Sequence, residues 1–153
     1  MLVWRIVPKR RYSQAFSGEG ARLYGGRWNP AGTRVVYTSA TLSLAALEYF
    51  VHVSKETRPD DLVSISLEIP KNVRMEHVSG SKLPSNWRLY PAMDELKEIG
   101  KKWIKNGAAA VLVVPSAVIP QELNYLINPD HADFKKMKIS KPAPFNLDER
   151  MFG

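Results

Sequence analysis

The stretch L-V-S-I-S-L-E-I at residues 62–69 alternates apolar and polar side chains. A period of two is typical of a β-strand with one buried face, and Pro70 ends this strand. Outward from it, the sequence predicts further strands at residues 2–7, 34–38, 73–78, 110–114, 123–127 and 134–139. These strands outnumber the predicted helices and do not alternate with them regularly. We therefore expect an α+β fold with a mixed, mainly antiparallel sheet and few helices.

Two helices are predicted, over residues 42–53 and 93–106. Thr41 stands where it can cap the first helix, which has an apolar face. The second helix has acidic residues in its first turn, lysines towards its end and Gly107 directly after it. Residues 8–33 are rich in glycine and proline and are predicted to be mainly loop, and the tail at 141–153 to be irregular. A loop as long as 8–33 is usually functional or disordered.

Length and composition narrow the class of protein. A chain of 153 residues is predicted to form one domain, spanning 1–153. The absence of cysteine excludes a disulfide scaffold, a cysteine-ligated metal site and a thiol nucleophile. No apolar run approaches the ~18 residues of a membrane span, and the N-terminus lacks the apolar core of a secretory signal. We expect a soluble cytoplasmic protein with no membrane association.

The positive charge is concentrated near the N-terminus. Residues 1–34 hold seven basic residues and one acid, Glu19, so that +6 of the net +7 lies there. Such a field favours a polyanionic ligand, either nucleic acid, a phosphate-rich small molecule or an acidic partner protein. The alternative is a segment that only makes the surface soluble.

Within that basic segment, Gly25-Gly26-Arg27-Trp28-Asn29-Pro30 combines two glycines with an arginine. The glycines allow a tight turn close to a ligand, and a guanidinium can bind phosphate with two parallel hydrogen bonds. Trp28 could also stack on a base. The alternative is a hairpin turn with a surface Arg27 and a core Trp28.

Two further polar residues, Glu48 and Ser116, have both a functional and a structural interpretation. Glu48 lies on one stripe of its helix with Thr41 and His52, which is either a solvated stripe or the lining of a pocket. Ser116 follows an apolar strand without a G-x-S-x-G motif, so that a turn hydroxyl is the default. The three histidines share no metal-binding spacing, and we expect no metal site.

Together these segments resemble the RES domain family, the toxins of bacterial toxin–antitoxin pairs whose partner is an Xre-type helix-turn-helix protein. The likeness covers nearly the whole chain. The matching segments are Trp4-Arg5, Gly25-Gly26-Arg27-Trp28-Asn29-Pro30-Ala31-Gly32, Val36-Tyr37, Leu44-Ala45-Ala46-Leu47-Glu48 with His52, Leu112-Val113-Val114-Pro115-Ser116-Ala117-Val118, Glu122-Leu123-Asn124-Tyr125-Leu126-Ile127-Asn128-Pro129-Asp130-His131 and Asp133-Phe134. The departures, Ala31 and Ala132 where proline is common, touch no proposed catalytic group.

The resemblance implies a mono-ADP-ribosyltransferase-like fold and action on NAD⁺ as substrate, with no prosthetic group. The arginine, glutamate and serine that name the family fall on Arg27, Glu48 and Ser116, and its recurrent active-site tyrosine falls on Tyr37. Members most often degrade NAD⁺ by hydrolysis or phosphorolysis, and some relatives modify a protein. The implied partner is an Xre-type antitoxin, and we expect nucleic-acid contact only through that antitoxin.

On this interpretation each site residue has its own role in cleaving the bond between nicotinamide and ribose. Glu48 stabilises the developing cation or holds the 2′-hydroxyl, and Arg27 clamps the pyrophosphate. Tyr37 offers a ring face to nicotinamide, Ser116 hydrogen-bonds ribose or amide, and Trp28 walls the pocket. The alternatives are ADP-ribosyl transfer to a protein, an RNA-binding or ribonuclease toxin, and a non-catalytic interaction domain.

Overall fold

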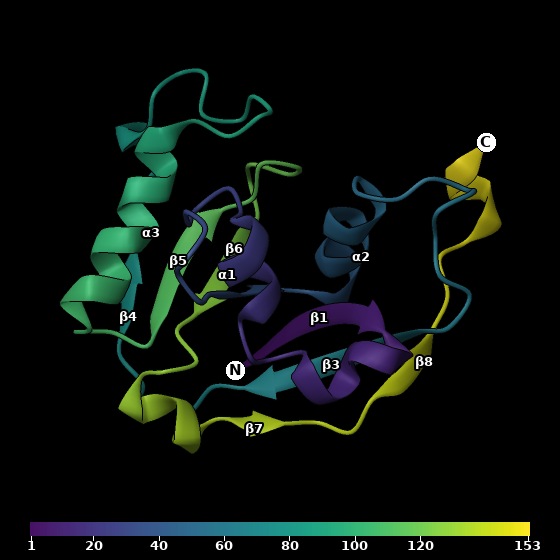
Figure 1. The fold of residues 1–153 in the computed structure, drawn as a ribbon, viewed down its shortest axis with the longest axis horizontal. Coiled ribbons are helices and arrows are strands. Elements are labelled where there is room, and N and C mark those ends of the chain that lie inside the picture. The colour runs from purple at the N-terminus through teal and green to yellow at the C-terminus, as the bar shows by residue number, and fades with distance from the viewer.

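Eight strands form one sheet in the computed structural model, which describes all residues 1–153 (Figure 1). Seven of them lie in the spatial order β4 (Met75–His77), β5 (Val111–Pro115), β6 (Leu123–Ile127), β2 (Val36–Ser39), β1 (Leu2–Pro8), β3 (Leu62–Glu68) and β7 (Lys138–Ile139). The eighth, β8 (Ala143–Phe145), pairs with β3. Only β4 and β5 run parallel, and every other pair is antiparallel. The predicted α+β class with a mixed, mainly antiparallel sheet is confirmed.

The sheet has two halves that meet where β1 lies beside β2. These two strands share a single registered pair, Trp4 with Ser39, whereas β1 and β3 pair along the full length of β1. Beside the single pair, Arg5 Nη1 donates a hydrogen bond to the carbonyl oxygen of Tyr37 at 2.8 Å. Figure 1 shows β4, β5 and β6 roughly upright, with β1, β3 and β7 lying roughly horizontal beside and below them. The junction of the two halves is therefore held by side chains as well as by the backbone ladder.

Apolar packing covers both faces of the half that contains β5. Val111 and Val113 point into a cluster of 16 buried residues that also contains Val3 and Ile65. The alternate residues Leu112 and Val114 point the other way, into a cluster with three buried tryptophans. A strand buried on both faces reads as a continuous apolar run, which is the pattern of residues 110–114.

Two helices pack against this sheet. Helix α2 (Leu42–Phe50) contacts β1 and β2, and Thr41 Oγ1 caps it by accepting a hydrogen bond from Leu44 N at 3.1 Å. Helix α3 (Asp94–Asn106) buries Leu96 and Trp103 against β5 and ends at Gly107, whose φ of +68° is left-handed. The cap and the C-terminal glycine agree with the sequence predictions, although α2 ends three residues before the predicted boundary.

The structure differs from the sequence predictions in the irregular segments. The expected loop at 8–33 contains the 3₁₀ helix η1 (Lys9–Gln14) and a short helix α1 (Glu19–Tyr24). The first half of the expected strand at 134–139 belongs to the 3₁₀ helix η3 (Ala132–Lys136), and only β7 at its end is a strand. The tail contains β8 and the 3₁₀ helix η4 (Glu149–Phe152), and a further 3₁₀ helix, η2 (Gly80–Lys82), follows β4. Each element is too short to show a period in the sequence.

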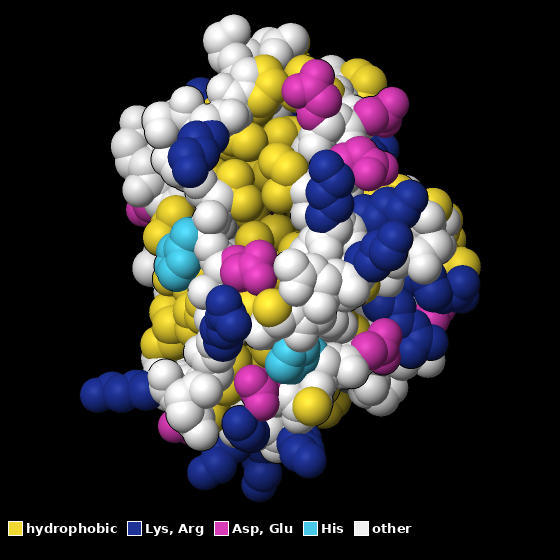
Figure 2. Space-filling model, turned by 90° about the vertical axis from the view of Figure 1, so that its left-hand side faces the viewer, with side chains coloured by type: hydrophobic (Ala, Val, Ile, Leu, Met, Phe, Trp, Pro, Cys, Tyr) yellow, Lys and Arg dark blue, Asp and Glu magenta, His cyan; other side chains and the backbone are white.

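Two hollows lie on the surface away from the sheet junction. One, of about 450 Å³, is lined by α3 and residues 82–84. Figure 2 looks onto the α3 side of the molecule and shows apolar surface there between charged side chains. The other hollow, of about 530 Å³, is lined by residues 58–62 and 146–149. None of the helices has the length and hydropathy needed to cross a bilayer, and no cluster of three or more His, Asp or Glu side chains is arranged to hold a metal ion.

Candidate active site

The turn that carries Arg27 depends on two glycines. Gly25 has a φ of +70°, a left-handed conformation that glycine adopts without strain. A Cβ on Gly26 would lie 2.6 Å from the hydroxyl oxygen of Tyr37, so only glycine fits against that side chain. Gly26 N donates a hydrogen bond to Asn29 O at 3.0 Å and closes the turn. The sequence prediction of a tight glycine turn at this point is confirmed.

The side chains of Tyr37 and Asn29 fix this turn by hydrogen bonds. The Tyr37 hydroxyl donates a hydrogen bond to Asn29 Oδ1 at 2.6 Å and accepts one from Trp28 N at 3.1 Å. Asn29 Nδ2 in turn donates to the carbonyl oxygens of three residues of the surrounding loop, Ala21, Pro30 and Thr33. Burial raises the pKa of Tyr37, so its hydroxyl stays neutral. The hydroxyl therefore anchors the Arg27 turn, and contact of the ring with nicotinamide stays a prediction.

Arg27 is half-buried, and only one of its nitrogens bonds within the protein. Nη1 donates to the carbonyl oxygens of Trp87 and Leu89, both at 3.0 Å. Nε and Nη2 have no protein partner and are not buried, so one edge of the guanidinium is free. Partial burial lowers the pKa of Arg27, and the charge of Glu48 opposes this shift. A fixed guanidinium with a free edge of two N–H groups suits bidentate binding of an oxyanion.

Trp28 does not line the site. Its side chain is 2% exposed and packs in the core with Trp87 and Leu96, so that neither ring face is free for a ligand. This burial corrects the prediction that Trp28 walls the pocket or stacks on a base. The ring instead ties the Arg27 turn to the residues beneath α3.

Glu48 lies on α2, and one of its two carboxylate oxygens is held by the protein. Oε1 accepts a hydrogen bond from Ser116 Oγ at 2.7 Å and another from Asn124 Nδ2 at 2.6 Å. Oε2 has no protein partner and is not buried. The arrangement fixes the carboxylate and leaves one oxygen open. Of the two interpretations of the polar stripe on this helix, a bare solvated surface does not fit a carboxylate held by these two donors, of which Ser116 is buried.

The hydroxyl group of Ser116 orients the carboxylate of Glu48. Ser116 is 0% exposed, and its oxygen accepts hydrogen bonds from Val118 N and Ile119 N, both at 3.0 Å. A hydroxyl has two acceptor sites and one hydrogen, so the remaining hydrogen is directed to Glu48. With its full capacity used inside the protein, Ser116 orients the carboxylate, which corrects the predicted hydrogen bond to ribose or amide.

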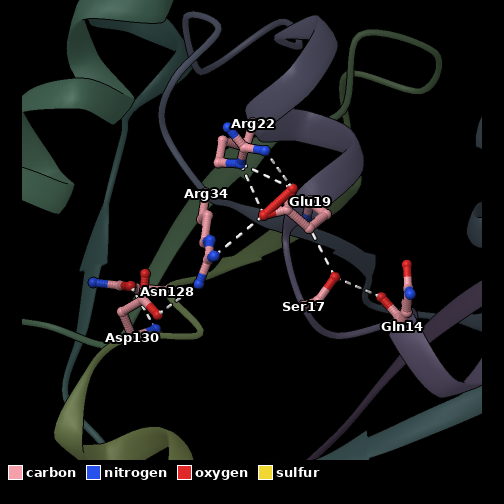
Figure 3. Close-up of polar contacts among 7 residues, drawn as sticks. All are labelled: Gln14, Ser17, Glu19, Arg22, Arg34, Asn128 and Asp130. Carbon is pink, nitrogen blue, oxygen red and sulfur yellow. Dashed lines mark hydrogen bonds and ion pairs between the residues drawn. The ribbon is translucent and has the colours of Figure 1, made fainter.

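The positive segment at 1–34 is partly neutralised. Figure 3 shows Arg22 and Arg34 both paired with Glu19, while Arg34 also reaches Asp130 at 3.5 Å. Arg5 is used at the sheet junction. The ion pairs tie α1 to the segment before β2 and to the turn after β6, so part of the charge that suggested a polyanionic ligand is structural.

Arg27 and Glu48 lie within electrostatic range of each other. Their charges interact, yet the two side chains do not form an ion pair, so the carboxylate and the guanidinium edge both remain available. Neither of the two surface hollows is lined by these residues. Hydrogen bonds join Ser116 to Glu48 and Tyr37 to the Arg27 turn, and the grouping of all four residues in one active site stays a prediction.

Sequence reasoning assigned no role to Asn29 and Asn124. Both lie inside the motifs that carry the family resemblance. An asparagine in such a motif is a signal, because its amide can both donate and accept hydrogen bonds. The partners of each amide could not be read from the sequence, because Asn124 and Glu48 are 76 residues apart.

Comparisons with known proteins point to one family. The family described as RES domain matches residues 2–148. Toxin Res of Photorhabdus laumondii subsp. laumondii is 36% identical over 152 residues, covering 99% of this chain and 97% of that protein. A Prs ADP-ribosylating toxin of Sphingobium sp. is also 36% identical over 152 residues, covering 97% and 94%. Among solved structures, one of the M. tuberculosis MbcT–MbcA toxin–antitoxin complex superposes with a TM-score of 0.75, at 13% identity, over 94% of this chain and 83% of the matched one. This last likeness is one of fold.

Proposed function

The chain belongs to the RES domain family, and on this premise we propose that it is the toxin of a toxin–antitoxin pair and degrades NAD⁺. The proposed reaction cleaves the bond between nicotinamide and ribose, with water or inorganic phosphate as acceptor. One observation carries the proposal. Glu48 is a carboxylate whose Oε1 is held by two donors while Oε2 is open, within electrostatic range of a guanidinium with a free edge.

The chemistry needs one well-placed anion. When the C1′–N bond breaks, its electron pair returns to the cationic ring nitrogen, and nicotinamide leaves as a neutral molecule without a general acid. Positive charge grows on the ribose, as in glycoside hydrolysis. The open oxygen of Glu48 stabilises that cation or accepts a hydrogen bond from the 2′-hydroxyl. Water or phosphate then bonds to C1′ and releases its proton to solvent.

The other residues bind and orient. The Nε and Nη2 edge of Arg27 holds the pyrophosphate, on a turn that Tyr37 anchors. Ser116 keeps the carboxylate of Glu48 in one orientation. NAD⁺ is the substrate, and this chemistry calls for no prosthetic group or metal ion.

The name of one relative favours a protein as a second acceptor of ADP-ribose. The Sphingobium protein of 36% identity is named a Prs ADP-ribosylating toxin. Transfer of ADP-ribose to a protein passes through the same ribose cation, so the same Glu48 and Arg27 serve it. Only the group that captures the cation differs.

The proposed partner is an Xre-type helix-turn-helix antitoxin, which would make all contacts with nucleic acid. A solved structure of the same fold holds a toxin with its antitoxin. A toxin that consumes the NAD⁺ of its own cell acts in the cytoplasm, and we place this protein there.

The direct test is NAD⁺ turnover by the purified protein, with and without phosphate, and with products identified by mass. We expect nicotinamide in both cases. The second product is ADP-ribose when water is the acceptor, and ADP-ribose carrying a phosphate on the same C1′ when phosphate is the acceptor. Labelled NAD⁺ incubated with a cell extract tests the second acceptor, because a labelled protein band reports transfer. Intact NAD⁺ in both assays would contradict the proposal and leave a non-catalytic domain or an RNA-directed toxin. Of these, RNA binding would show affinity that falls steeply with salt.

Replacing Glu48 separates catalysis from folding. Glu48→Gln keeps the shape of the side chain and removes its charge, so we expect kcat to fall about 10²–10³-fold. The matched control is Glu68→Gln, an exposed carboxylate on β3, for which we expect unchanged turnover. Turnover by Glu48→Gln at the parental rate, measured as nicotinamide release, would remove Glu48 from the reaction.

A further inference from the structure

We propose that Asn124, fixed from behind by Ser39, is a positioning residue that sets the orientation of the Glu48 carboxylate. Ser39 lies at the end of β2, Asn124 on β6 and Glu48 on α2, and their side chains form one line of hydrogen bonds. The inference rests on the proposed function, in which Glu48 stabilises the ribose cation. It adds a residue to which the family name and the motifs assign no part.

The direction of each hydrogen bond in this line is determined. Ser39 Oγ donates to Asn124 Oδ1 at 2.8 Å, so that the oxygen of the Asn124 amide faces Ser39. The amide nitrogen consequently faces Glu48, and Nδ2 donates to Oε1 at 2.6 Å. Without Ser39, the amide could turn over and present an oxygen to a carboxylate, which would be repulsive.

Glu48 is thus held by two independent donors on the same oxygen. Ser116 approaches from the turn after β5, and its hydrogen has no other acceptor. Asn124 approaches from β6. Two donors on Oε1 prevent the carboxylate from rotating. The open oxygen, Oε2, is therefore presented in one direction.

The side chain of Asn124 is not needed to build the strand. β6 lies between β5 and β2, and the backbone of Asn124 is registered with Val114 on one side and Ser39 on the other. Strand pairing therefore survives a change of the amide. This separation of backbone and side chain makes the residue suitable for a test of positioning.

The test compares Asn124→Asp with Asn124→Ala and measures the pH profile of kcat for NAD⁺. At low pH the introduced carboxyl group is protonated and still donates to Glu48. As the pH rises it loses that proton, and two carboxylates then face each other at hydrogen-bond distance. We expect a new loss of activity on the basic side, which the parent chain lacks. Asn124→Ala should lower kcat about 10²-fold at every pH, because a misplaced group costs this much even when the fold is intact.

The matched control is Asn128→Asp, which places the same change at a buried asparagine directly after β6. Asn128 accepts a hydrogen bond from Asp130 N at 3.0 Å, as an aspartate can, and it does not contact Glu48. All these variants keep the other charged or titratable groups near Glu48. These are Arg27, whose charge interacts with that of Glu48, and His52, four residues further along the chain. We expect Asn128→Asp to keep the parental pH profile.

A second readout keeps this inference apart from the proposed function. NMR titration follows the side-chain carboxyl carbons as the pH is raised. It detects whether Glu48 and the carboxyl group introduced by Asn124→Asp keep one shared proton to a higher pH than the carboxyl groups in Asn128→Asp keep theirs. This titration does not depend on turnover. If the parent chain leaves NAD⁺ intact, the proposed function fails and the titration still decides the positioning. A parental pH profile together with independent titration of the two carboxyl groups would overturn the inference.

Discussion

Arg27 has five N–H donors, and the protein occupies only those on Nη1. The two backbone carbonyl oxygens that accept them belong to Trp87 and Leu89, which orient the guanidinium before any ligand arrives. At the scale of single residues the site follows one rule. One side of each key group, Nη1 of Arg27 and Oε1 of Glu48, is bound by the protein, and the other side is left open. Such preorganisation lowers the cost of ordering a side chain when substrate binds.

The free edge of Arg27 is tested by Arg27→Lys. An ammonium group cannot form the two parallel hydrogen bonds of a guanidinium, and it cannot bridge the two carbonyl oxygens with one nitrogen in the same geometry. We expect the KM for NAD⁺ to rise roughly tenfold or more, since a hydrogen bond to a charged group contributes about 1.5–3 kcal/mol. Steady-state kinetics measures the change. Arg74→Lys, at an exposed arginine away from the site, controls for the exchange itself, and equal KM values in both variants would exclude the clamp.

At the scale of elements, the Arg27 turn is positioned by its contact with α3. Gly100 lies on the buried side of that helix, and a Cβ there would lie 1.7 Å from the carbonyl oxygen of Trp28. The backbone of the turn thus rests directly on the helix. A glycine that would weaken an isolated helix is required here by this close approach.

Gly100→Ala tests this contact. Ordinary helix propensity favours alanine by about 1 kcal/mol, yet the clash must displace either α3 or the turn. We expect the free energy of unfolding to fall by about 1–3 kcal/mol, the usual cost of overpacking, and kcat/KM for NAD⁺ to fall with it. Urea unfolding and nicotinamide release measure the two effects. In the control, Gly20→Ala on α1, a Cβ meets nothing within 4 Å, and we expect equal or higher stability. A stabilised Gly100→Ala would contradict the contact.

At the scale of the whole molecule, charge pairs join segments that the sheet alone leaves loosely connected. Glu19 links Arg22 in α1 to Arg34 before β2, and Arg34 reaches Asp130 beyond β6 (Figure 3). These side chains are partly exposed, so each pair contributes little by itself and is screened by salt. The network orders the segment between β1 and β2 that carries the Arg27 turn.

The network predicts how stability depends on pH and salt. The hydrogen bond from Arg22 and the charges of Arg22 and Arg34 lower the pKa of Glu19. Its stabilisation is therefore present above the ordinary pKa of a glutamate and is lost as the pH falls through the lowered value. We expect Glu19→Gln to lower the thermal midpoint slightly at neutral pH and low salt, and to match the parent in acid or in high salt. Thermal unfolding followed by circular dichroism measures the difference. A difference independent of pH and salt would contradict an electrostatic origin.

Much of the fold could be predicted because its longer elements carry a local period. The alternation at 62–69, the apolar run at 110–114 and the helix ending at Gly107 all lie within one or two residues of the observed elements. The misses are α1, η3 and β8, which are short and contain glycine or proline or lack a period. β8 forms only because β3 offers an edge for it to pair with.

Residue identity alone limited the chemistry that a site in this chain can perform. A lone glutamate in a helix, an arginine after two glycines and the absence of cysteine are properties of the sequence, and each limits what a site can do. Tertiary structure decided which atoms meet. Ser116 and Asn124 lie 68 and 76 residues from Glu48, and they turn towards it only because β5, β6 and β2 pair in one register and α2 contacts β2. The period of a strand is local, whereas a hydrogen bond depends on where distant strands are placed beside each other.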